Sequence, residues 1–245
     1  MIGIKTAPTG EDLFGRSKWW GFPDLPEELD WPSVPVNDEG DEYDDPLTFI
    51  CQIRCEDLAP FDPEGLLPHE GMLYFFAALD YFLGNLDAVA APGLGEWEVP
   101  YFRVLYSPTC ERLHTHSLLY DDGSPACLPA ESLSFSRLAA SSTEDDAAKD
   151  DAGEGSVVRR RFLREPVRSG SEPYHTPFDG TRLLGQPFYE EVSSELPGMI
   201  SLLQIDENDS WDLRFFDCGM LNFLITPEDL AARRWSVVRV WLHSA

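Results

Sequence analysis

The chain has 245 residues, of which 43% are hydrophobic and 12% aromatic, and this composition excludes a globally disordered protein. Its 44 acidic and 18 basic residues give a formal net charge of −26, which disfavours binding to nucleic acid or an anionic membrane and favours basic proteins or cations. Acidity by itself more often serves only to keep a protein soluble and monomeric.

The N-terminus and the cysteines indicate a cytoplasmic protein. Residues 1–14 lack the apolar stretch of a signal peptide, and no apolar run approaches the roughly 18–20 residues that span a bilayer. The chain has five cysteines, an odd number without dense spacing, which is typical of reduced thiols. We therefore expect a cytoplasmic monomer that binds neither nucleic acid nor membrane.

The first part of the chain alternates between proline-rich and strand-like segments. Residues 19–36 carry four prolines among aromatic residues, which predicts an irregular segment pinned to the core. Residues 37–46, NDEGDEYDDP, are predicted to form an acidic turn or loop. Alternating apolar residues over 47–54 and a continuous apolar run over 71–79 predict two strands, the second with both faces covered.

The middle of the chain contains two further predicted strands and a linker. The strands are expected over 99–108 and 132–138. Residues 139–156 include six acids and one lysine with almost no large apolar residue, which predicts a solvated loop or linker. This linker separates a first β-rich unit, residues 1–138, from a second, residues 157–245, and we expect the two units to pack as one compact body.

The second unit repeats the motif order of the first. Each contains a Gly-x-Pro motif, then a strand that ends in Gln-Ile, then an apolar strand that begins with Gly-Met-Leu. The motifs lie at 21–23, 52–53 and 71–73 in the first unit and at 185–187, 204–205 and 219–221 in the second. We interpret the repeat as an internal duplication. Gly71 and Gly219 are expected where the backbone turns or packs closely.

The end of the chain predicts one helix and one strand. Thr226 as N-cap, Pro227 at the first helical position and Asp229 two residues later indicate a short helix. Alternating residues over 235–244 predict a closing strand. The predicted fold class is therefore mainly β, a β-rich α+β protein, with antiparallel sheets in a roll-like or sandwich-like arrangement and a few short helices.

Several of these segments together resemble the YwqG-like family. The segments that carry the resemblance are SKWWGFPDLPEELDWP, LTFICQIRCEDLAPF, GLLPHEGMLYFF and FRVLY, and then RLLGQP, LLQID and DCGMLNFLITPEDLAARRWSVVRVWLHS. They cover most of the chain outside residues 125–180. The resemblance implies a cytoplasmic, mainly β protein with internal duplication. It also implies a group whose biochemical activity is not established and some of whose members lie beside toxin genes.

Two positions depart from the pattern of that family. The segment GQPFYEEV lacks the glutamine that the family carries after this motif. The segment FFDCG replaces a tryptophan-glycine-aspartate trio, of which only Asp217 remains. A family ligand site at these positions would be altered in this chain.

Signals for catalysis or metal binding are weak. Cys110, His114 and His116 could offer three metal ligands, but exposed or core histidines are the commoner explanation. Cys51 and Cys55 on one strand would lie about 13 Å apart, too far for a disulfide or a shared zinc ion. No nucleophile, phosphate-loop or zinc-protease motif is present. We therefore expect no metal and no cofactor, and we favour a protein that is not an enzyme.

Two hypotheses for function remain. The first is a non-catalytic, cytoplasmic protein-binding module that docks a basic protein through its acidic surface, with an immunity-like role as one form. The alternative is a small-molecule-binding protein or an enzyme, with its site in the cleft between the two units. The residues proposed for binding are Gln52, Gln204, Asp217, Trp31 and Trp211. The alternative predicts that Gln52 and Gln204 converge on one pocket.

Overall fold

The computed structural model describes residues 1–120, 122–138 and 180–244, so the predicted linker at 139–156 lies outside the described residues. The strands are β1 (Ile2–Pro8), β2 (Lys18–Trp19), β3 (Asp24–Pro26), β4 (Ser33–Asp38), β5 (Asp41–Pro46), β6 (Thr48–Arg54), β7 (Met72–Ala77), β8 (Gly95–Trp97), β9 (Phe102–Ser107), β10 (Leu113–Thr115), β11 (Glu131–Arg137), β12 (Arg182–Leu183), β13 (Ile200–Asp206), β14 (Met220–Ile225) and β15 (Arg239–His243). In this part of the chain the helices are α1 (Cys55–Leu58), α3 (Glu190–Glu195) and α4 (Pro227–Ala231), with 3₁₀ turns η1 (Tyr81–Leu83), η2 (Asp209–Trp211) and η3 (Trp235–Val237).

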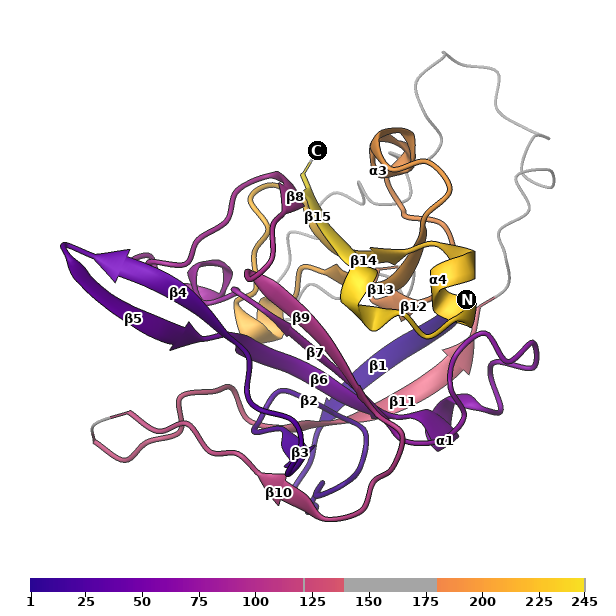
Figure 1. Cartoon of the computed structure of the whole chain (residues 1–245), viewed down its shortest axis with the longest axis horizontal. Helices are drawn as coiled ribbons and strands as arrows, with labels where there is room; N and C mark the ends of the chain where they lie inside the picture. Colours follow the sequence, from indigo (N-terminus) through magenta and orange to yellow (C-terminus); the bar gives the residue numbers. More distant parts are fainter. Residues whose placement is uncertain (121, 139–179, 245) are drawn as a thin grey trace, which may run out of the picture.

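One antiparallel sheet of 11 strands runs through the molecule, in the order β8-β15-β14-β13-β12-β1-β11-β2-β6-β7-β9. Its centre is the pair β1 and β11, which are in register from Ile2 opposite Arg137 to Pro8 opposite Glu131. The remaining strands lie on either side of this pair, and the sheet curves so that its two halves face each other (Figure 1). The mainly β, antiparallel, roll-like prediction is confirmed.

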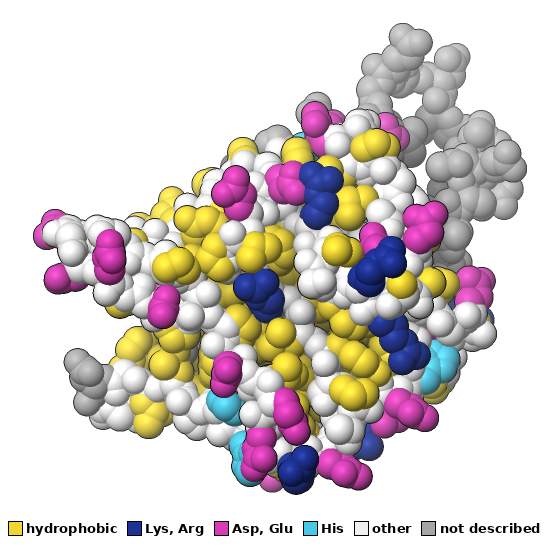
Figure 2. Space-filling view, viewed as in Figure 1, with side chains coloured by type: hydrophobic (Ala, Val, Ile, Leu, Met, Phe, Trp, Pro, Cys, Tyr) yellow, Lys and Arg dark blue, Asp and Glu magenta, His cyan; other side chains and the backbone are white. Residues whose placement is uncertain are grey.

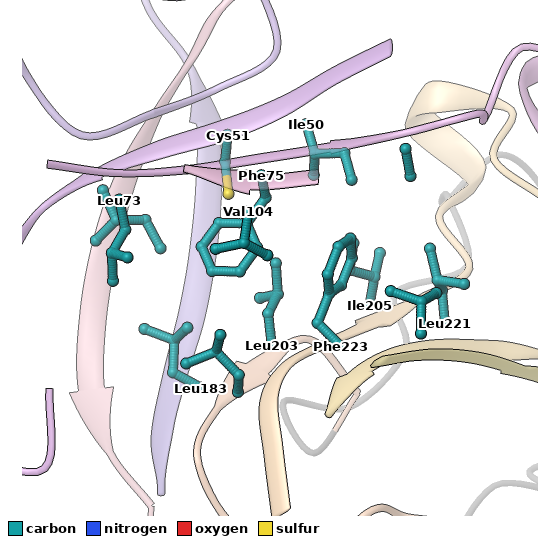
Figure 3. Packing of buried hydrophobic residues seen from close by; sticks show 14 of the residues in the cluster. Ile50, Cys51, Leu73, Phe75, Val104, Leu183, Leu203, Ile205, Leu221 and Phe223 are labelled. Atoms are coloured by element: carbon teal, nitrogen blue, oxygen red, sulfur yellow. The ribbon is translucent and has the colours of Figure 1, made fainter. Parts of the chain in front are cut away.

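The space between the two halves is filled by the central core. Its largest cluster of buried apolar residues draws on strands from both sides of the β1–β11 pair. Figure 3 shows Leu73 and Phe75 of β7 pointing toward Leu203 and Phe223 from β13 and β14. The rings of Phe75 and Phe223 are 5.4 Å apart and perpendicular. Each such side chain contributes about 1.5–3 kcal/mol by leaving water, so this core joins the halves.

The two halves of the sheet repeat the same backbone geometry. A bulge interrupts β6 between Phe49 and Cys51, and another interrupts β13 between Ser201 and Leu203. In each strand the bulge lies just before the glutamine. The residue after each short strand, β2 and β12, adopts a left-handed backbone, with φ of 57° at Trp20 and 61° at Leu184. The equivalent cross-strand pairs are Lys18 with Gln52 and Trp19 with Cys51 in one half, and Arg182 with Gln204 and Leu183 with Leu203 in the other. Internal duplication remains our interpretation of this repeat.

Several local predictions are confirmed. Every residue of β7 is buried, as expected for a strand with both faces covered. Thr226 caps α4 by accepting a hydrogen bond from the Asp229 backbone N–H, at 3.1 Å. Gly71 has φ of 84°, and a Cβ at this position would overlap the carbonyl oxygen of Ser107. A Cβ on Gly219 would likewise overlap a carbonyl oxygen, that of Phe215.

The acidic segment 37–46 was predicted to be a turn or loop, and this prediction is wrong. Residues 33–46 form the hairpin β4–β5, which turns at Glu39 and Gly40. Both turn residues have positive φ, 51° and 105°, as in the two-residue turns that match the twist of a hairpin. Acidic residues are depleted in strands, so composition pointed to a loop, whereas the turn and the buried base determined the strand pairing.

Candidate functional site

Gln52 holds together the loops of the first half. Its side chain is fully buried, its Oε1 accepts from the Asp24 backbone N–H at 2.8 Å, and its Nε2 donates to the Arg16 carbonyl at 2.9 Å. The Nε2 group also donates to the Asp24 carboxylate at 2.9 Å. Both the oxygen and the nitrogen of the amide are therefore hydrogen-bonded within the protein, which suits a structural role in holding these loops to β6.

Gln204 repeats this role in the second half. It is fully buried, its Oε1 accepts from the Phe188 backbone N–H at 2.9 Å, and its Nε2 donates to the Gly180 carbonyl at 2.7 Å. The two glutamines thus connect equivalent loops to equivalent strands. This is the backbone bonding that their shared position in the repeat suggests.

Gln52 and Gln204 do not converge on one place. Four strands, β2, β11, β1 and β12, separate their strands in the sheet order. Their chain neighbours Cys51, Ile53 and Leu203 belong to the central core. Because side chains alternate between the faces of a strand, both glutamines point away from that core. The space between the halves holds apolar side chains instead.

A buried ion pair beside Gln52 was not anticipated from the sequence. The Oδ2 atom of Asp24 accepts from Lys18 Nζ at 2.7 Å, from the Gly15 backbone N–H at 2.9 Å and from Gln52. Its Oδ1 accepts from the Thr115 hydroxyl at 2.7 Å. Both charged residues are almost fully buried. The only sequence signal was two charged residues inside a segment rich in aromatics and proline, where burial requires a partner.

The chemistry of the Asp24 cluster is that of a fixed carboxylate. Burial on its own raises the pKa of Asp24, but the hydrogen bonds from Lys18, Thr115 and Gly15 outweigh it, so the pKa lies below its ordinary value. A carboxylate that remains ionised with both oxygens occupied has no proton to give and little capacity to accept one. The cluster therefore fits a structural role better than acid–base catalysis.

The remaining predicted binding residues lie in separate places. Asp217 is exposed, and its backbone N–H donates to Ser244 Oγ at 3.1 Å. Trp31 is half-buried and donates its indole N–H to the Leu47 carbonyl at 2.7 Å. Trp211 is buried and stacks on Trp19 in the core, with ring centroids 5.6 Å apart. The structure does not assemble these residues into one site.

The surroundings of the cysteines favour the protonated form of their thiols. Burial is the main cause that raises the pKa of each of the five thiols, to about 12 at Cys55 and about 11 at Cys127. A thiol with a raised pKa stays protonated and unreactive near neutral pH. Within the described residues no group of three or more His, Cys, Asp or Glu side chains is placed to hold a metal ion. His114, one of the three ligands considered above, is exposed and lies 3.6 Å from Glu27.

The feature that stands apart from the compact body is the hairpin β4–β5, which projects from it (Figure 1). Its base is held firmly, because Val34 is buried in a second apolar cluster and the Leu47 backbone N–H donates to the Pro32 carbonyl at 2.9 Å. Acidic side chains line the projecting part (Figure 2). They are Asp38, Glu39, Asp41, Glu42, Asp44 and the half-buried Asp45.

The charges of this hairpin are not neutralised by the described part of the chain. No ion pair joins any of the six acids to a described lysine, arginine or histidine. Asp38 stands directly opposite Asp41, an arrangement that destabilises a strand pair. Partial desolvation, together with the charges of Asp45 and Asp38, raises the pKa of Tyr43. Tyr43 itself is 46% exposed between these acids.

Two hollows adjoin the hairpin. The first, at its base, is a cavity of about 10 Å³ between Asp45, Thr48 and Asp80, which has room for one water molecule. The second is an open hollow against the strands themselves, lined by Pro35, Val36, Asn37, Glu42, Tyr43 and Asp44. The hairpin thus offers an open surface rather than an enclosed pocket, which suits a macromolecular partner better than a small molecule.

The comparisons with known proteins give a family without an assigned activity. A family model described as "Domain of unknown function (DUF1963)" matches residues 17–243. No curated protein matches the chain. Within the described residues, no helix has the length and apolar character needed to cross a membrane.

Proposed function

This chain belongs to the DUF1963 family, and we propose that it is a non-catalytic, cytoplasmic protein-binding module that docks a basic protein partner. The docking surface in this proposal is the acidic hairpin, residues 33–46. A net charge of −26 would draw a basic partner toward the molecule, and the hairpin would then provide the specific contact.

The observation that carries the proposal is that the acids of this hairpin have no ionic partner among the described residues. Asp38 and Asp41 face each other across the turn at a cost in stability, although neutral residues would form the same turn. Tyr43, with an exposed ring among the acids, is of the residue type that anchors protein interfaces. A basic partner would relieve the repulsion and cover the ring.

An immunity-like role is one form of this proposal. The resemblance to the YwqG-like family, some of whose members lie beside toxin genes, supports it. Neutralising a toxin needs a tight surface contact and no catalytic group. The fixed Asp24 carboxylate and the protonated thiols are in keeping with a protein that lacks one.

The alternative, a small-molecule site between the two units, has less support. It needs Gln52 and Gln204 to meet, and both bind loop backbone on the outer faces of the sheet. Apolar side chains such as Phe75 and Phe223 fill the intervening space.

The test is a binding comparison between two variants with the same net charge. The hairpin variant carries Asp38→Asn, Glu39→Gln, Asp41→Asn, Glu42→Gln and Asp44→Asn. The control variant carries Asp30→Asn, Glu64→Gln, Glu70→Gln, Asp87→Asn and Glu98→Gln, at exposed acids elsewhere. Each protein is used as bait in lysate of the host at low and high salt.

We expect wild-type and control proteins to retain one stoichiometric basic protein that is lost at high salt, and the hairpin variant to bind it at least about tenfold more weakly, a loss of about 1.4 kcal/mol. Equal loss in both variants would mean that net charge alone attracts the partner. If the hairpin variant bound the partner as tightly as wild type, the hairpin would be excluded as the docking surface.

A further inference from the structure

The two edges of the acidic hairpin differ in their capacity to bind another strand. In the described part of the chain, β4 and β5 pair only with each other, so each has a free edge. Antiparallel pairs alternate between hydrogen-bonded and non-hydrogen-bonded positions. The Leu47 N–H bonds to the Pro32 carbonyl, so position 32 opposite 47 is a hydrogen-bonded pair. The alternation then directs the backbone groups of 33, 35 and 37 on β4, and of 42, 44 and 46 on β5, to the free edges.

Proline blocks one edge at its centre and the other only at its end. Pro35 lies in the middle of the outward positions of β4 and has no N–H to donate. On β5 the corresponding proline, Pro46, is at the base, so Glu42 and Asp44 present two consecutive outward N–H and carbonyl groups. A strand can therefore add to β5 with an uninterrupted ladder, whereas β4 is protected in the way that natural edge strands often are.

The side chains along this edge follow a symmetrical pattern. Asp41 and Glu42 precede Tyr43, and Asp44 and Asp45 follow it. Successive side chains alternate between the two faces of the strand, so both faces of an added strand meet acids. An added strand with the order basic-basic-apolar-basic-basic would pair a cation with each acid and an apolar side chain with Tyr43. We take the added strand to be antiparallel, because antiparallel pairing is slightly more stable per residue than parallel pairing.

We propose that the free edge of β5 binds an extended basic segment of the partner as a third, antiparallel strand of the acidic hairpin. The segment has the pattern basic-basic-apolar-basic-basic. This inference rests on the proposed function and adds the mode of recognition to it. Main-chain hydrogen bonds to Glu42 and Asp44 hold the segment, and cross-strand ion pairs select its basic side chains.

The experiment uses the full chain and the peptide acetyl-Lys-Lys-Val-Lys-Lys-amide as a probe. Antiparallel addition places peptide residues 2 and 4 directly opposite Asp44 and Glu42, so the N–H groups of residues 2 and 4 face β5 and those of residues 1, 3 and 5 face away from it. We compare the unmodified peptide with one N-methylated at residues 2 and 4 and with one N-methylated at residues 1 and 5. All three carry the same charge. Affinity is measured by titration calorimetry at low salt.

We expect methylation at residues 2 and 4 to weaken binding at least tenfold, and methylation at residues 1 and 5 to change it less than threefold. Hydrogen exchange followed by NMR provides a second readout. The amides of Glu42 and Asp44 should become protected in the complex, while those of Ser33 and Asn37 on the other edge should not. Protection on both edges, or on neither, contradicts strand addition at β5.

The outcomes separate the mode of binding from the proposed function. If the methylated peptides bind alike, the hairpin attracts basic segments by charge alone, so strand addition is overturned while the proposed function stands. If the unmodified peptide fails to bind at millimolar concentration, strand addition is overturned as well. If, in addition, the neutralised hairpin variant forms dimers, the acids serve to keep the edge apart from a second copy of the chain, and the proposed function falls too.

Discussion

At the scale of single residues, the most consequential contact is the buried pair of Asp24 and Lys18. The carboxylate accepts four hydrogen bonds from groups that come from three separate segments of the first unit. Such a pair adds little stability over an apolar substitute, but removal of one partner leaves the other charge buried and alone. The pair therefore contributes more to the specific arrangement of these segments than to the net stability of the fold.

We predict that Asp24→Asn destabilises the protein by about 3–5 kcal/mol, because Lys18 then lies buried without a counter-charge. Urea unfolding measures the change in the free energy of unfolding. The matched control, Asp30→Asn at an exposed position, should change it by less than about 0.5 kcal/mol. A small effect at Asp24 would show that solvent reaches the pair.

The pKa of Asp24 also predicts a dependence of stability on pH. Because the folded-state pKa lies below the unfolded value of about 3.9, the contribution of this carboxylate is complete above that pH. It is lost as the pH falls through the lower folded-state pKa. Unfolding free energies of wild type and Asp24→Asn should therefore converge in acid. Parallel curves down to about pH 2 would contradict the lowered pKa.

The two glutamines should contribute to stability, because each holds loop backbone to a strand through hydrogen bonds. Gln52→Leu leaves the Asp24 N–H and the Arg16 carbonyl without this partner, and we expect a loss of about 1–3 kcal/mol. Gln204→Leu should cost a similar amount through Phe188 and Gly180. Unfolding measures both effects. Neither substitution should alter peptide binding at the hairpin, and a weakened affinity with unchanged stability would indicate a binding role instead.

At the scale of elements, the two Gly-Met-Leu strands begin at positions where only glycine fits. Gly71 has a left-handed backbone, and any Cβ there would meet the Ser107 carbonyl of β9. At Gly219 the corresponding obstacle is the Phe215 carbonyl. The close approach lets each apolar strand enter the sheet directly beside its neighbour.

We predict that Gly71→Ala destabilises the protein by about 3 kcal/mol or more, since the new Cβ adds a steric overlap to an unfavourable φ. Gly93→Ala is the matched control, because nothing lies within 4 Å of a Cβ at that position. The control should be neutral or slightly stabilising in thermal unfolding. Equal effects at the two glycines would argue against the close approach.

At the scale of the whole molecule, the net charge of −26 acts on stability as well as on partners. Mutual repulsion among like charges destabilises a compact state, and salt screens it over a distance of about 10 Å at 0.1 M. The acidic hairpin carries some of this charge on a projecting segment, which packs against the body through Val34 and Val36.

We predict that 0.5 M NaCl raises the Tm above its value in 0.02 M NaCl. A gain of about 1 kcal/mol corresponds to about 2–4 °C for a chain of this size. Thermal unfolding followed by circular dichroism measures the shift, and the control is the same ionic strength reached with KCl. The hairpin variant should gain less than wild type, because five of the repelling charges are gone. A fall in Tm would contradict net repulsion.

The sequence predicted those features that depend on neighbouring residues. The apolar run of β7 and the Thr226 cap of α4 were both located correctly, because periodicity and capping are properties of a single segment. The hairpin β4–β5 was assigned to a loop, since its acids disfavour a strand while its register depends on Val34 packing elsewhere. The Asp24 cluster was missed because its members are distant in the sequence, with Thr115 lying 91 residues after Asp24.

By itself, the sequence determined that this protein is mainly β, strongly acidic and built with a repeated order of motifs. Composition and local periodicity are enough for that. Only the tertiary structure decided that Gln52 and Gln204 point to outer faces and that apolar side chains fill the space between the halves. It also decided that six acids without an ionic partner among the described residues lie on one projecting hairpin. Those outcomes depend on which distant strands pair and in what register, and a shift of one residue would turn every side chain of a strand to the other face.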